Sequence, residues 1–482
     1  MKYNYDVVII GGGAGGLTAA KTAKGFGKKV CILEKADRLG GECTWTGCVP
    51  SKAIIKTARV AHFTNNLSTY GLSSDITELD TTKVMEHVGK TIQKVYRTHT
   101  PDQLKKEGID VLFGPPSFID AHHIMSGDKE ISFNKAIICT GSSPFVPPIP
   151  GLKDIDFLTN ENLWALQELP QSMIILGGGP IGCEMASAFA RLGTAITIIE
   201  MNDRILPRED LEMIHLLNEQ FEREGIELAT NRTAKKVSEE NGMVVVDTVD
   251  KDDNAYRYSA EKILVATGRK PNLEGLNLEN AGVQSSKKGI TVDCTLMTTA
   301  SNIYACGDVV GPYLFSHMAW YQAVTAVRNA FIPIFKKRVD YENVIWVTFT
   351  APELATAGLT EKAAREKYGE KGIHIFRFDY KDLDRAMTDE TEFGLCKIIC
   401  DTSYRIVGIH ILGVGAGDII HEAQLAKTKG MKLWEIQSVI HAYPTYSELI
   451  WKDAKLAFVR KLLNNPFINF FRSLFTDKET KQ

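Results

Sequence analysis

The sequence predicts an α/β protein in which two strand–turn–helix–strand units precede a C-terminal α+β domain. Three observations support this. A glycine-rich turn follows a buried strand at two places, both turns have the same internal spacing, and residues 341–464 contain no third turn of this kind. The length of 482 residues also suits three domains, at roughly 150 residues each.

The first unit begins with a short buried strand at residues 5–10, YDVVII. Glycines in G-x-G-x-x-G spacing follow at Gly11, Gly13 and Gly16, then a helical stretch, LTAAKTAKGFG, and a strand, VCILE, that ends at Glu34. Glycines let the backbone turn tightly and approach a pyrophosphate, the helix N-terminus offers free N–H groups, and the acid accepts hydrogen bonds from a ribose. The unit is therefore predicted to bind a dinucleotide.

The second unit repeats the pattern. MIIL leads into Gly177, Gly179 and Gly182, a helical CEMASAFARLG follows, and AITIIE ends at Glu200. In both units the acid stands 23 residues after the first glycine. Two glycine-rich turns in an ordinary α/β protein are the alternative, but the repeated spacing favours two dinucleotide sites.

Domain boundaries follow from the prolines. SSPFVPPIPG (142–151) contains four prolines and predicts a stiff linker, and GRKPN (268–272) marks a second break. The predicted domains are 1–149 and 150–270, with 271–340 completing the first, then 341–464 and a tail, 465–482. Within 341–464, the stretch 393–413 alternates like two strands with a turn at Asp401–Tyr404, and GDIIHEAQLAKTKGM and LWEIQSVIH read as helices.

Composition excludes several classes of protein. With 56 Lys+Arg against 59 Asp+Glu, the net charge of -3 gives no reason to expect a nucleic-acid partner. No apolar run is long enough to predict a transmembrane helix. Glycines follow the apolar residues Val7–Ile10, so the start is not predicted to be a signal peptide, and a cytoplasmic, reducing location is expected for the nine cysteines.

The candidate chemistry lies in GGECTWTGCVPSKAII, directly after the first unit, where Cys43 and Cys48 are five residues apart. The spacing alone leaves a redox pair and two buried thiols as alternatives. Zinc would require a second pair of ligands at short spacing, and the remaining cysteines form no C-x₂-C, so no metal is predicted. The position beside a dinucleotide unit favours the redox pair.

Taken in order, these stretches resemble the class I pyridine nucleotide–disulfide oxidoreductases, the family of dihydrolipoamide dehydrogenase, glutathione reductase and mercuric reductase. The resemblance covers roughly residues 4–464. Besides the glycine turns and the cysteine stretch, it rests on ICTGS (138–142), VATGRKPN (265–272), IYACGD (303–308), FTAPELATAG (349–358) and HAYPTYSE (441–448).

The resemblance implies the cofactors FAD and NAD and the residues that bind them. Residues implied to hold FAD are Gly11, Gly13, Gly16, Glu34, Gly141 and Asp308. Residues implied to hold the nicotinamide dinucleotide are Gly177, Gly179, Gly182, Glu200 and Gly268. NADH is expected to be preferred over NADPH, because the carboxylate of Glu200 would meet a 2′-phosphate with like charge.

The resemblance also implies catalytic roles. Cys48 would lie against the flavin and make the charge-transfer contact, Cys43 would face the substrate, Lys52 would lie near the flavin's reactive nitrogen, and Glu184 would pair with Lys52. Electrons would pass from NADH through the flavin and the dithiol to a disulfide such as a lipoamide-type substrate. A metal-ion or quinone reductase that uses the same centre is the alternative, and a flavoprotein that only docks or senses is disfavoured by the intact set of residues.

The chain departs from the family pattern near its end. Thiol-active members are homodimers in which one subunit supplies a His, before a Pro, to the other subunit's cysteine, and here Tyr443 precedes Pro444 while Glu448 is kept. Tyrosine has an ordinary pKa near ~10 and is a poor base at neutral pH. His441 either replaces that base or is structural. Mercuric reductases carry Tyr here and a C-terminal cysteine pair, but this chain ends FTDKETKQ, so mercury detoxification is not expected.

The tail, 465–482, has apolar residues at helical spacing, namely Phe467, Phe470, Phe471, Leu474 and Phe475. From residue 452 onward there are seven Lys or Arg and three acids. An aromatic face with basic flanks is suited to an anionic membrane surface. Packing of this face against the enzyme's own dimer is the alternative.

Overall fold

The computed structural model describes residues 3–64, 66–73, 79–332, 334–466 and 468. These divide into two compact units. The nucleotide unit contains residues 1–203 and 227–340, and the C-terminal unit contains residues 204–226 and 341–482. The aromatic residues predicted for the tail lie outside the described residues, so its membrane contact stays a prediction.

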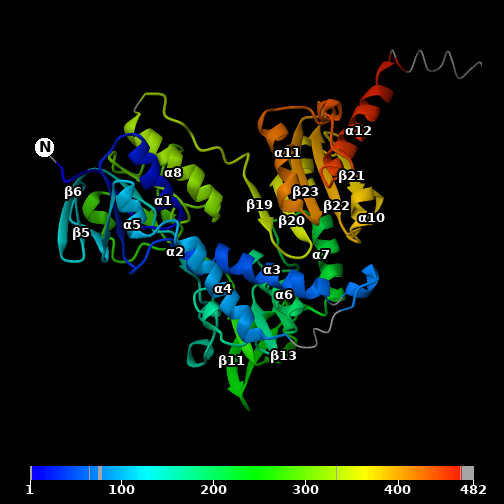
Figure 1. The fold of residues 1–482 in the computed structure, drawn as a ribbon, viewed down its shortest axis with the longest axis horizontal. Coiled ribbons are helices and arrows are strands. Elements are labelled where there is room, and N and C mark those ends of the chain that lie inside the picture. Colours follow the sequence, from blue (N-terminus) through cyan, green and yellow to red (C-terminus); the bar gives the residue numbers. More distant parts are fainter. Residues whose placement is uncertain (1–2, 65, 74–78, 333, 467, 469–482) are drawn as a thin grey trace, which may run out of the picture. The chain divides into compact units, whose positions relative to one another are not determined.

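The first sheet of the nucleotide unit has seven strands in the order β3-β2-β1-β6-β5-β4, and β18 also pairs with β6. Its parallel strands are β1 (Tyr5–Ile10), β2 (Val30–Glu34), β3 (Ile109–Phe113), β6 (Lys129–Ile138) and β18 (Ile303–Ala305). The antiparallel strands are β4 (Pro116–Phe118) and β5 (His123–Ser126). Helices α1 (Ala14–Gly25) and α8 (Ser316–Phe331) pack together on this sheet (Figure 1). Small buried residues such as Ala20 and Ala323 belong to their shared core.

The second sheet of this unit is parallel, in the order β10-β9-β8-β14. Its strands are β8 (Ser172–Leu176), β9 (Ala195–Ile199), β10 (Glu227–Ala229) and β14 (Lys262–Val265), and α6 (Pro180–Arg191) joins β8 to β9. A three-stranded antiparallel sheet follows, formed by β11 (Thr233–Glu240), β12 (Met243–Val249) and β13 (Ala255–Ala260). The elements β1-α1-β2 and β8-α6-β9 are thus the predicted repeat.

The remaining helices of the nucleotide unit are short or lie near the cysteines. They are α2 (Gly41–Trp45), α3 (Cys48–Thr64), α4 (Thr81–Tyr96) and α5 (Pro101–Lys106), with 3₁₀ helices at Leu67–Tyr70, Leu152–Asp154, Leu163–Ala165 and Leu278–Ala281. Two small strands, β16 (Ser285–Ser286) and β17 (Gly289–Ile290), pair with each other. None of the helices in the described part of the chain combines the length and the apolar character needed to cross a bilayer.

The two predicted breaks in the chain pair with each other. Strand β7 (Ser142–Pro144) runs antiparallel to β15 (Arg269–Pro271), so Ser142 faces Pro271. The proline-rich stretch and the GRKPN stretch are therefore two sides of one ribbon. This ribbon joins the part of the unit that holds the first sheet to the part that holds the second.

The C-terminal unit is built on a five-stranded antiparallel sheet in the order β19-β20-β23-β22-β21. Its strands are β19 (Ile345–Thr348), β20 (Glu353–Gly358), β21 (Ile373–Asp379), β22 (Leu395–Asp401) and β23 (Ile406–Gly413). Its helices are α7 (Leu211–Arg223), α9 (Glu361–Tyr368), α10 (Asp384–Thr388), α11 (Ala416–Thr428) and α12 (Glu448–Leu463), with 3₁₀ helices at Tyr380–Asp382 and Leu433–Ser438. Helices α11 and α12 lie against this sheet (Figure 1). Buried side chains of β20, β22 and β23 form one core with these two helices.

The predicted hairpin in this unit agrees with β22 and β23, which are joined by a turn containing Tyr404 at φ +65°. The stretch LWEIQSVIH differs from its prediction. It forms only a 3₁₀ helix, Leu433–Ser438, after which Val439 is extended at φ -82° and ψ 129°. The β-branched Val439 and Ile440 explain the difference, because such residues lose side-chain freedom in a helix.

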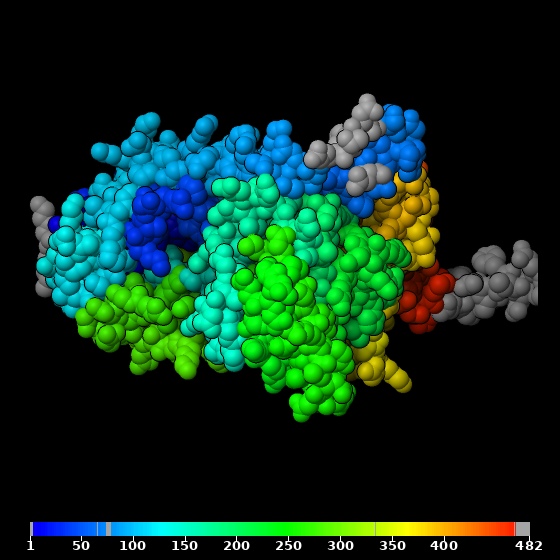
Figure 2. Space-filling model, turned by 90° about the horizontal axis from the view of Figure 1, so that it is seen from below, coloured from blue at the N-terminus to red at the C-terminus, as the bar shows by residue number. Residues whose placement is uncertain are grey.

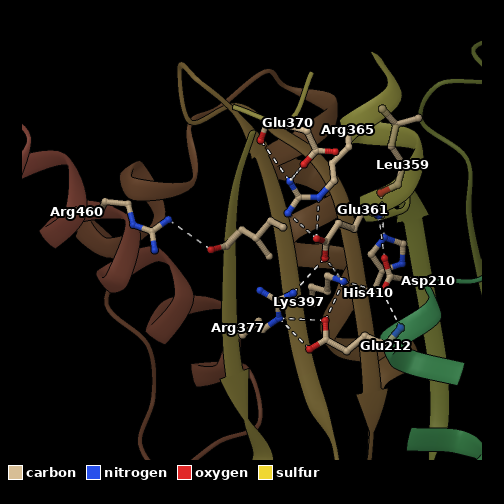
Figure 3. A network of polar contacts seen from close by, with 11 residues as sticks. Asp210, Glu212, Leu359, Glu361, Arg365, Glu370, Arg377, Lys397, His410 and Arg460 are labelled. Carbon is tan, nitrogen blue, oxygen red and sulfur yellow. Dashed lines mark hydrogen bonds and ion pairs between the residues drawn. The ribbon is translucent and has the colours of Figure 1, made fainter. Parts of the chain in front are cut away.

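The opposite face of the C-terminal sheet carries a polar network (Figure 3). Lys397 of β22 has only 2% of its side chain exposed, and its Nζ lies 2.7 Å from Asp210, 2.8 Å from Glu212 and 2.7 Å from Glu361. Burial alone would lower the pKa of Lys397, but its hydrogen bonds to these carboxylates raise the pKa overall. The first two acids begin α7 and the third begins α9, so one buried ammonium group holds two helices on the sheet.

Replacing Lys397 tests the importance of this network. Lys397→Met leaves three carboxylates beside one another without their ammonium partner, so we expect the C-terminal unit to lose about 3–5 kcal/mol of stability. Differential scanning calorimetry would measure the lowered melting temperature. The matched control is Lys381→Met, which removes an exposed lysine 3.7 Å from Asp379 and should cost less than about 1 kcal/mol. Equal effects of the two variants would contradict this account.

Candidate functional site

The first glycine turn is closely packed against the backbone around it. Gly11 has φ +102°, and a Cβ at this position would lie 2.5 Å from the carbonyl oxygen of Cys139. A Cβ at Gly16 would lie 1.8 Å from the carbonyl oxygen of Gly11. Gly13 precedes α1 and no side chain caps the helix there, so the first N–H groups of α1 are available to a phosphate.

The second glycine turn has the same geometry. Gly177 has φ +108°, and a Cβ there would lie 2.5 Å from the carbonyl oxygen of Ala266, while a Cβ at Gly182 would lie 2.1 Å from the carbonyl oxygen of Gly177. Gly179 precedes α6, again without a side-chain cap. Both turns therefore need glycine for the same steric reasons, and both leave a helix N-terminus open.

The acids at the strand ends are fixed in matching ways. Glu34 accepts a hydrogen bond from the N–H of Gly12 at 2.6 Å, and Glu200 accepts one from the N–H of Gly178 at 2.7 Å. The other carboxylate oxygens accept from the N–H of Ala36 and of Asn202. Each carboxylate is thus held under its glycine turn, and its remaining lone pairs can accept from ribose hydroxyls. These residues fit two dinucleotides.

A chain of polar contacts joins the cysteine stretch to Asp308. Asp308 accepts a hydrogen bond from Ser142 Oγ at 2.6 Å, and Arg269 Nε donates to the same Oγ at 2.8 Å. The guanidinium group of Arg269 also forms a two-pronged ion pair with Glu42, with Nη1 2.7 Å from Oε1. Glu42, Ser142 and Arg269 were not predicted as site residues, although Ser142 and Arg269 lie inside the ICTGS and VATGRKPN motifs and Glu42 directly precedes Cys43.

Gly141 and Gly268 flank the β7–β15 ribbon, at φ +69° and φ +141°. Beside the ribbon is a pocket of about 630 Å³, lined by residues that include Lys35, Ser143, Lys270 and Asn272. On the face shown in Figure 2, a hollow opens between the blue N-terminal residues and the teal residues that follow β7. Its volume is in the range of ligand-binding pockets, and Lys35 places it next to the acid of the first glycine unit.

The two cysteines are at the ends of a tight loop. Cys43 lies in α2 and Cys48 is the first residue of α3, and both are free thiols, the first partly buried and the second exposed. Gly41 has φ +55°, and a Cβ there would lie 2.6 Å from the Cα of Gly13. The cysteine loop therefore rests directly on the first glycine turn, and a larger residue at Gly41 would lift it away.

The two thiols differ in acidity. A hydrogen bond from Cys43 is the largest influence on Cys48 and, with Ser316 and Lys52, lowers its pKa to about 6. The surrounding protein atoms, which displace water around this partly accessible thiol, and Glu184 act in the opposite direction. The same hydrogen bond, with burial, raises the pKa of Cys43. The N-terminal position in α3 also favours a thiolate at Cys48, because the positive end of the helix dipole lies there.

The predicted lysine–glutamate pair is present. Lys52 lies one turn after Cys48 in α3, and its Nζ is 2.7 Å from Oε2 of Glu184, which is buried in α6. The pair thus joins the cysteine helix to the first helix of the second glycine unit. Ser316, whose Oγ lies 3.3 Å from Cys48 Sγ, was not predicted, and nothing in the sequence near it indicates this contact.

The remaining predicted residues lie in the C-terminal unit, each with a partner of its own. Tyr443 is 69% exposed and donates to Asp384 at 2.7 Å, and this hydrogen bond raises the pKa of the phenol. Glu448 is buried at the start of α12 and accepts from the N–H of Thr445.

His441 is held by two acceptors. Its Nδ1 lies 3.0 Å from the carbonyl oxygen of Val439 and its Nε2 lies 2.8 Å from Glu422 Oε1. Both ring nitrogens therefore have a partner within the same chain.

Comparison with known proteins agrees with this geometry. The family model described as pyridine nucleotide-disulphide oxidoreductase matches residues 5–330, and the model for the dimerisation domain of the same family matches residues 344–454. A mercuric reductase of Staphylococcus aureus is 33% identical over 448 residues, which are 92% of this chain and 81% of that one. A dihydrolipoyl dehydrogenase of Bacillus subtilis (strain 168) is 34% identical over 479 residues, 95% of this chain and 98% of that one.

Among solved structures, the HOCl-induced flavoprotein disulfide reductase RclA from Escherichia coli is similar, with a TM-score of 0.84 and 28% identity over 94% of this chain and 100% of that one. The predicted fold class and the predicted resemblance are both confirmed. The chain belongs to the pyridine nucleotide-disulphide oxidoreductase family and is an FAD-dependent enzyme that exchanges electrons between a pyridine nucleotide and a disulfide centre.

Proposed function

We propose that the enzyme is an NADH-dependent disulfide reductase in which Cys43 and Cys48 carry the electrons to the substrate. The observation that supports this most directly is the position of Cys48 at the N-terminus of α3, with Ser316 Oγ 3.3 Å from its sulfur and Lys52 one helical turn away. These contacts and a hydrogen bond from Cys43 lower the pKa of Cys48 and so favour its thiolate. A thiolate is the reactive form in thiol–disulfide exchange, so the reduced pair is ready to react.

The chemical steps balance within this pair. The proton of Cys43 moves along the hydrogen bond to Cys48, and the Cys43 thiolate attacks one sulfur of the substrate disulfide and releases the other as a thiolate. That thiolate takes the proton back from Cys48. Cys48 then attacks Cys43 Sγ, closes the Cys43–Cys48 disulfide and releases the second substrate thiolate, so two electrons reach the substrate.

FAD, when bound, supplies the hydride chemistry that links the nicotinamide to the disulfide. The residues proposed to hold FAD are Gly11, Gly13, Gly16, Glu34, Gly141 and Asp308, within domain 1–149 completed by 271–340. The residues proposed to hold NADH are Gly177, Gly179, Gly182, Glu200 and Gly268, within domain 150–270. Lys52, fixed by Glu184 at 2.7 Å, places a positive charge one helical turn from Cys48.

The preference for NADH rests on Glu200. Its carboxylate is buried and held by the N–H groups of Gly178 and Asn202, so it cannot swing away from a 2′-phosphate. Two arginines that follow in the chain are engaged elsewhere. Arg204 donates to the carbonyl of Pro207, and the guanidinium of Arg232 stacks on Tyr256 at 3.6 Å.

Metal-ion reduction is the second candidate, and the geometry of His441 favours it. Oxidation of a dithiol substrate needs a base, but both ring nitrogens of His441 are engaged by groups of the same chain and the phenol of Tyr443 has a raised pKa. A soft metal ion, bound between two sulfurs, needs no such base. Relatives include mercuric reductases, and RclA has been solved as a Cu(II) complex, at 27% identity over 95% of this chain and 100% of that one, with a TM-score of 0.83.

The two candidates can be separated by the choice of electron acceptor. The rate of NADH oxidation would be measured side by side with small disulfides, Cu(II), Hg(II) and quinones as acceptors.

The matching dimerisation domain indicates the homodimer of this family. We propose further that Tyr443 and Glu448 of the partner subunit lie beside Cys43. The exposure of Tyr443, 69% in the single chain, is consistent with a residue that serves another subunit.

The role of Cys48 can be tested by Cys48→Ser. This variant should retain FAD but lose both the long-wavelength absorbance of a thiolate–flavin contact and all disulfide turnover, because no second sulfur closes the pair. Absorption spectra during NADH titration and a coupled disulfide assay would measure both. Cys294→Ser, at an exposed cysteine, is the control. Normal disulfide turnover by Cys48→Ser would refute the assignment.

The position of Glu200 predicts a difference in kcat/KM between NADH and NADPH. We expect kcat/KM for NADH to exceed that for NADPH by at least about tenfold, the ratio given by ~1.4 kcal/mol of binding free energy. Glu200→Gln removes the negative charge that would repel a 2′-phosphate, so it should reduce the ratio of kcat/KM for NADH to that for NADPH. Equal kcat/KM values for the two nucleotides in the unaltered enzyme, at moderate salt, would show that Glu200 does not discriminate between NADH and NADPH.

Restoring a histidine before Pro444, where this chain has Tyr443, is predicted to increase activity. We expect oxidation of dihydrolipoamide to be slow, and Tyr443→His to accelerate it by about 10²-fold or more, since a positioned base contributes about 10²–10⁴-fold. Steady-state rates with NAD⁺ would measure this. Tyr368→His, at an exposed tyrosine of α9, is the control. A fast unaltered enzyme would show that another group already acts as the base.

A further inference from the structure

We infer that Ser316 is a further catalytic residue, whose hydroxyl donates a hydrogen bond to the Cys48 thiolate and keeps it able to attack Cys43. This inference rests on the proposed redox role of Cys48. The contact that carries it is the 3.3 Å distance between Ser316 Oγ and Cys48 Sγ, which joins residues 268 positions apart in the chain.

The fold holds Ser316 firmly in this position. It is the first residue of α8, a helix of 16 residues, and Phe315 before it is extended. Phe315 stacks on His317 with ring centroids 5.2 Å apart, and buried Gln322 of α8 accepts a hydrogen bond from the N–H of Gly307 at 2.7 Å. Helix α8 packs on α1, and α1 begins at the first glycine turn, on which the cysteine loop also rests. The same part of the fold therefore positions both Ser316 and the cysteine loop.

The groups that face Cys48 come from four helices. They are Cys43 of α2, Lys52 of α3, Glu184 of α6 and Ser316 of α8. Of these, Cys43 and Ser316 donate hydrogen bonds that lower the pKa of Cys48, Lys52 lowers it through its charge, and Glu184 raises it. Cys48 and Ser316 are each the first residue of their helix, so two helix N-termini also meet at this sulfur.

The two hydrogen-bond donors differ in one respect that decides the role of Ser316. Once Cys43 is bonded to the substrate in the mixed disulfide, it has no S–H left to donate. The hydroxyl of Ser316 is unchanged by that step and remains beside Cys48. Cys48 must be a thiolate at this moment, because it attacks Cys43 to release the second half of the substrate.

The test imitates this moment by removing the Cys43 donor. In full-length protein with FAD bound, the pH dependence of Cys48 alkylation by iodoacetamide is followed by mass spectrometry in Cys43→Ala, alone and combined with Ser316→Val or Ser316→Thr. Threonine and valine have nearly the same shape and differ in the hydroxyl. We expect the Cys48 pKa to rise by about one to two units with valine, since a hydrogen bond to a charged group is lost, and to remain low with threonine.

Ser285→Ala, at an exposed serine of β16, should leave the alkylation profile unchanged. FAD absorbance identifies any variant that has lost its cofactor through misfolding. Equal Cys48 pKa values for the valine and threonine variants would overturn the inference. The measurement concerns the acidity of Cys48 and not turnover, so it remains readable even if Cys48→Ser proves that the redox assignment is wrong.

Discussion

The contact between the cysteine loop and the first glycine turn is the constraint on which the rest of the site depends. Gly41 lies so close to Gly13 that a Cβ would stand 2.6 Å from its Cα. This contact places the N-terminus of α3, and with it Cys48, beside the turn that can receive a phosphate. Ser316 of α8 can reach Cys48 because the loop is held there.

The repeated unit shows why a dinucleotide site tolerates so little change in sequence. In each copy the first glycine is pressed against a carbonyl from a neighbouring strand end, and the third glycine is pressed against the first. In each copy the acid accepts from the N–H that follows the first glycine. The matching hydrogen bonds, of 2.6 Å and 2.7 Å, occur at two distant places in the chain. The same local packing is therefore used in both units, and a different dinucleotide is expected at each.

The sheet of the C-terminal unit is covered differently on its two faces. One face of its sheet is covered by an apolar core with α11 and α12, whereas the other holds α7 and α9 through the buried ammonium group of Lys397. Near its end, this unit presents Tyr443 to solvent but keeps His441 in contact with Glu422. An exposed side chain such as Tyr443 is available to another subunit, whereas His441 is engaged by Val439 and Glu422 of its own chain.

The two dinucleotide units could be predicted from short-range spacing in the sequence, and the position of Cys43 and Cys48 beside the first unit favoured a redox pair. The pairing of Lys52 with Glu184, which are 132 residues apart, and the departure at Tyr443 came from the resemblance to a known family. Four features became visible in the folded chain alone: the contact of Ser316 with Cys48, the pairing of Arg269 with Glu42, the pairing of the two predicted breaks as β7 and β15, and the attachment of two helices to their sheet by Lys397. The physical reason is that a hydrogen bond or ion pair between residues more than a hundred positions apart leaves no periodicity in the chain, since it arises only when packing brings the two backbones together.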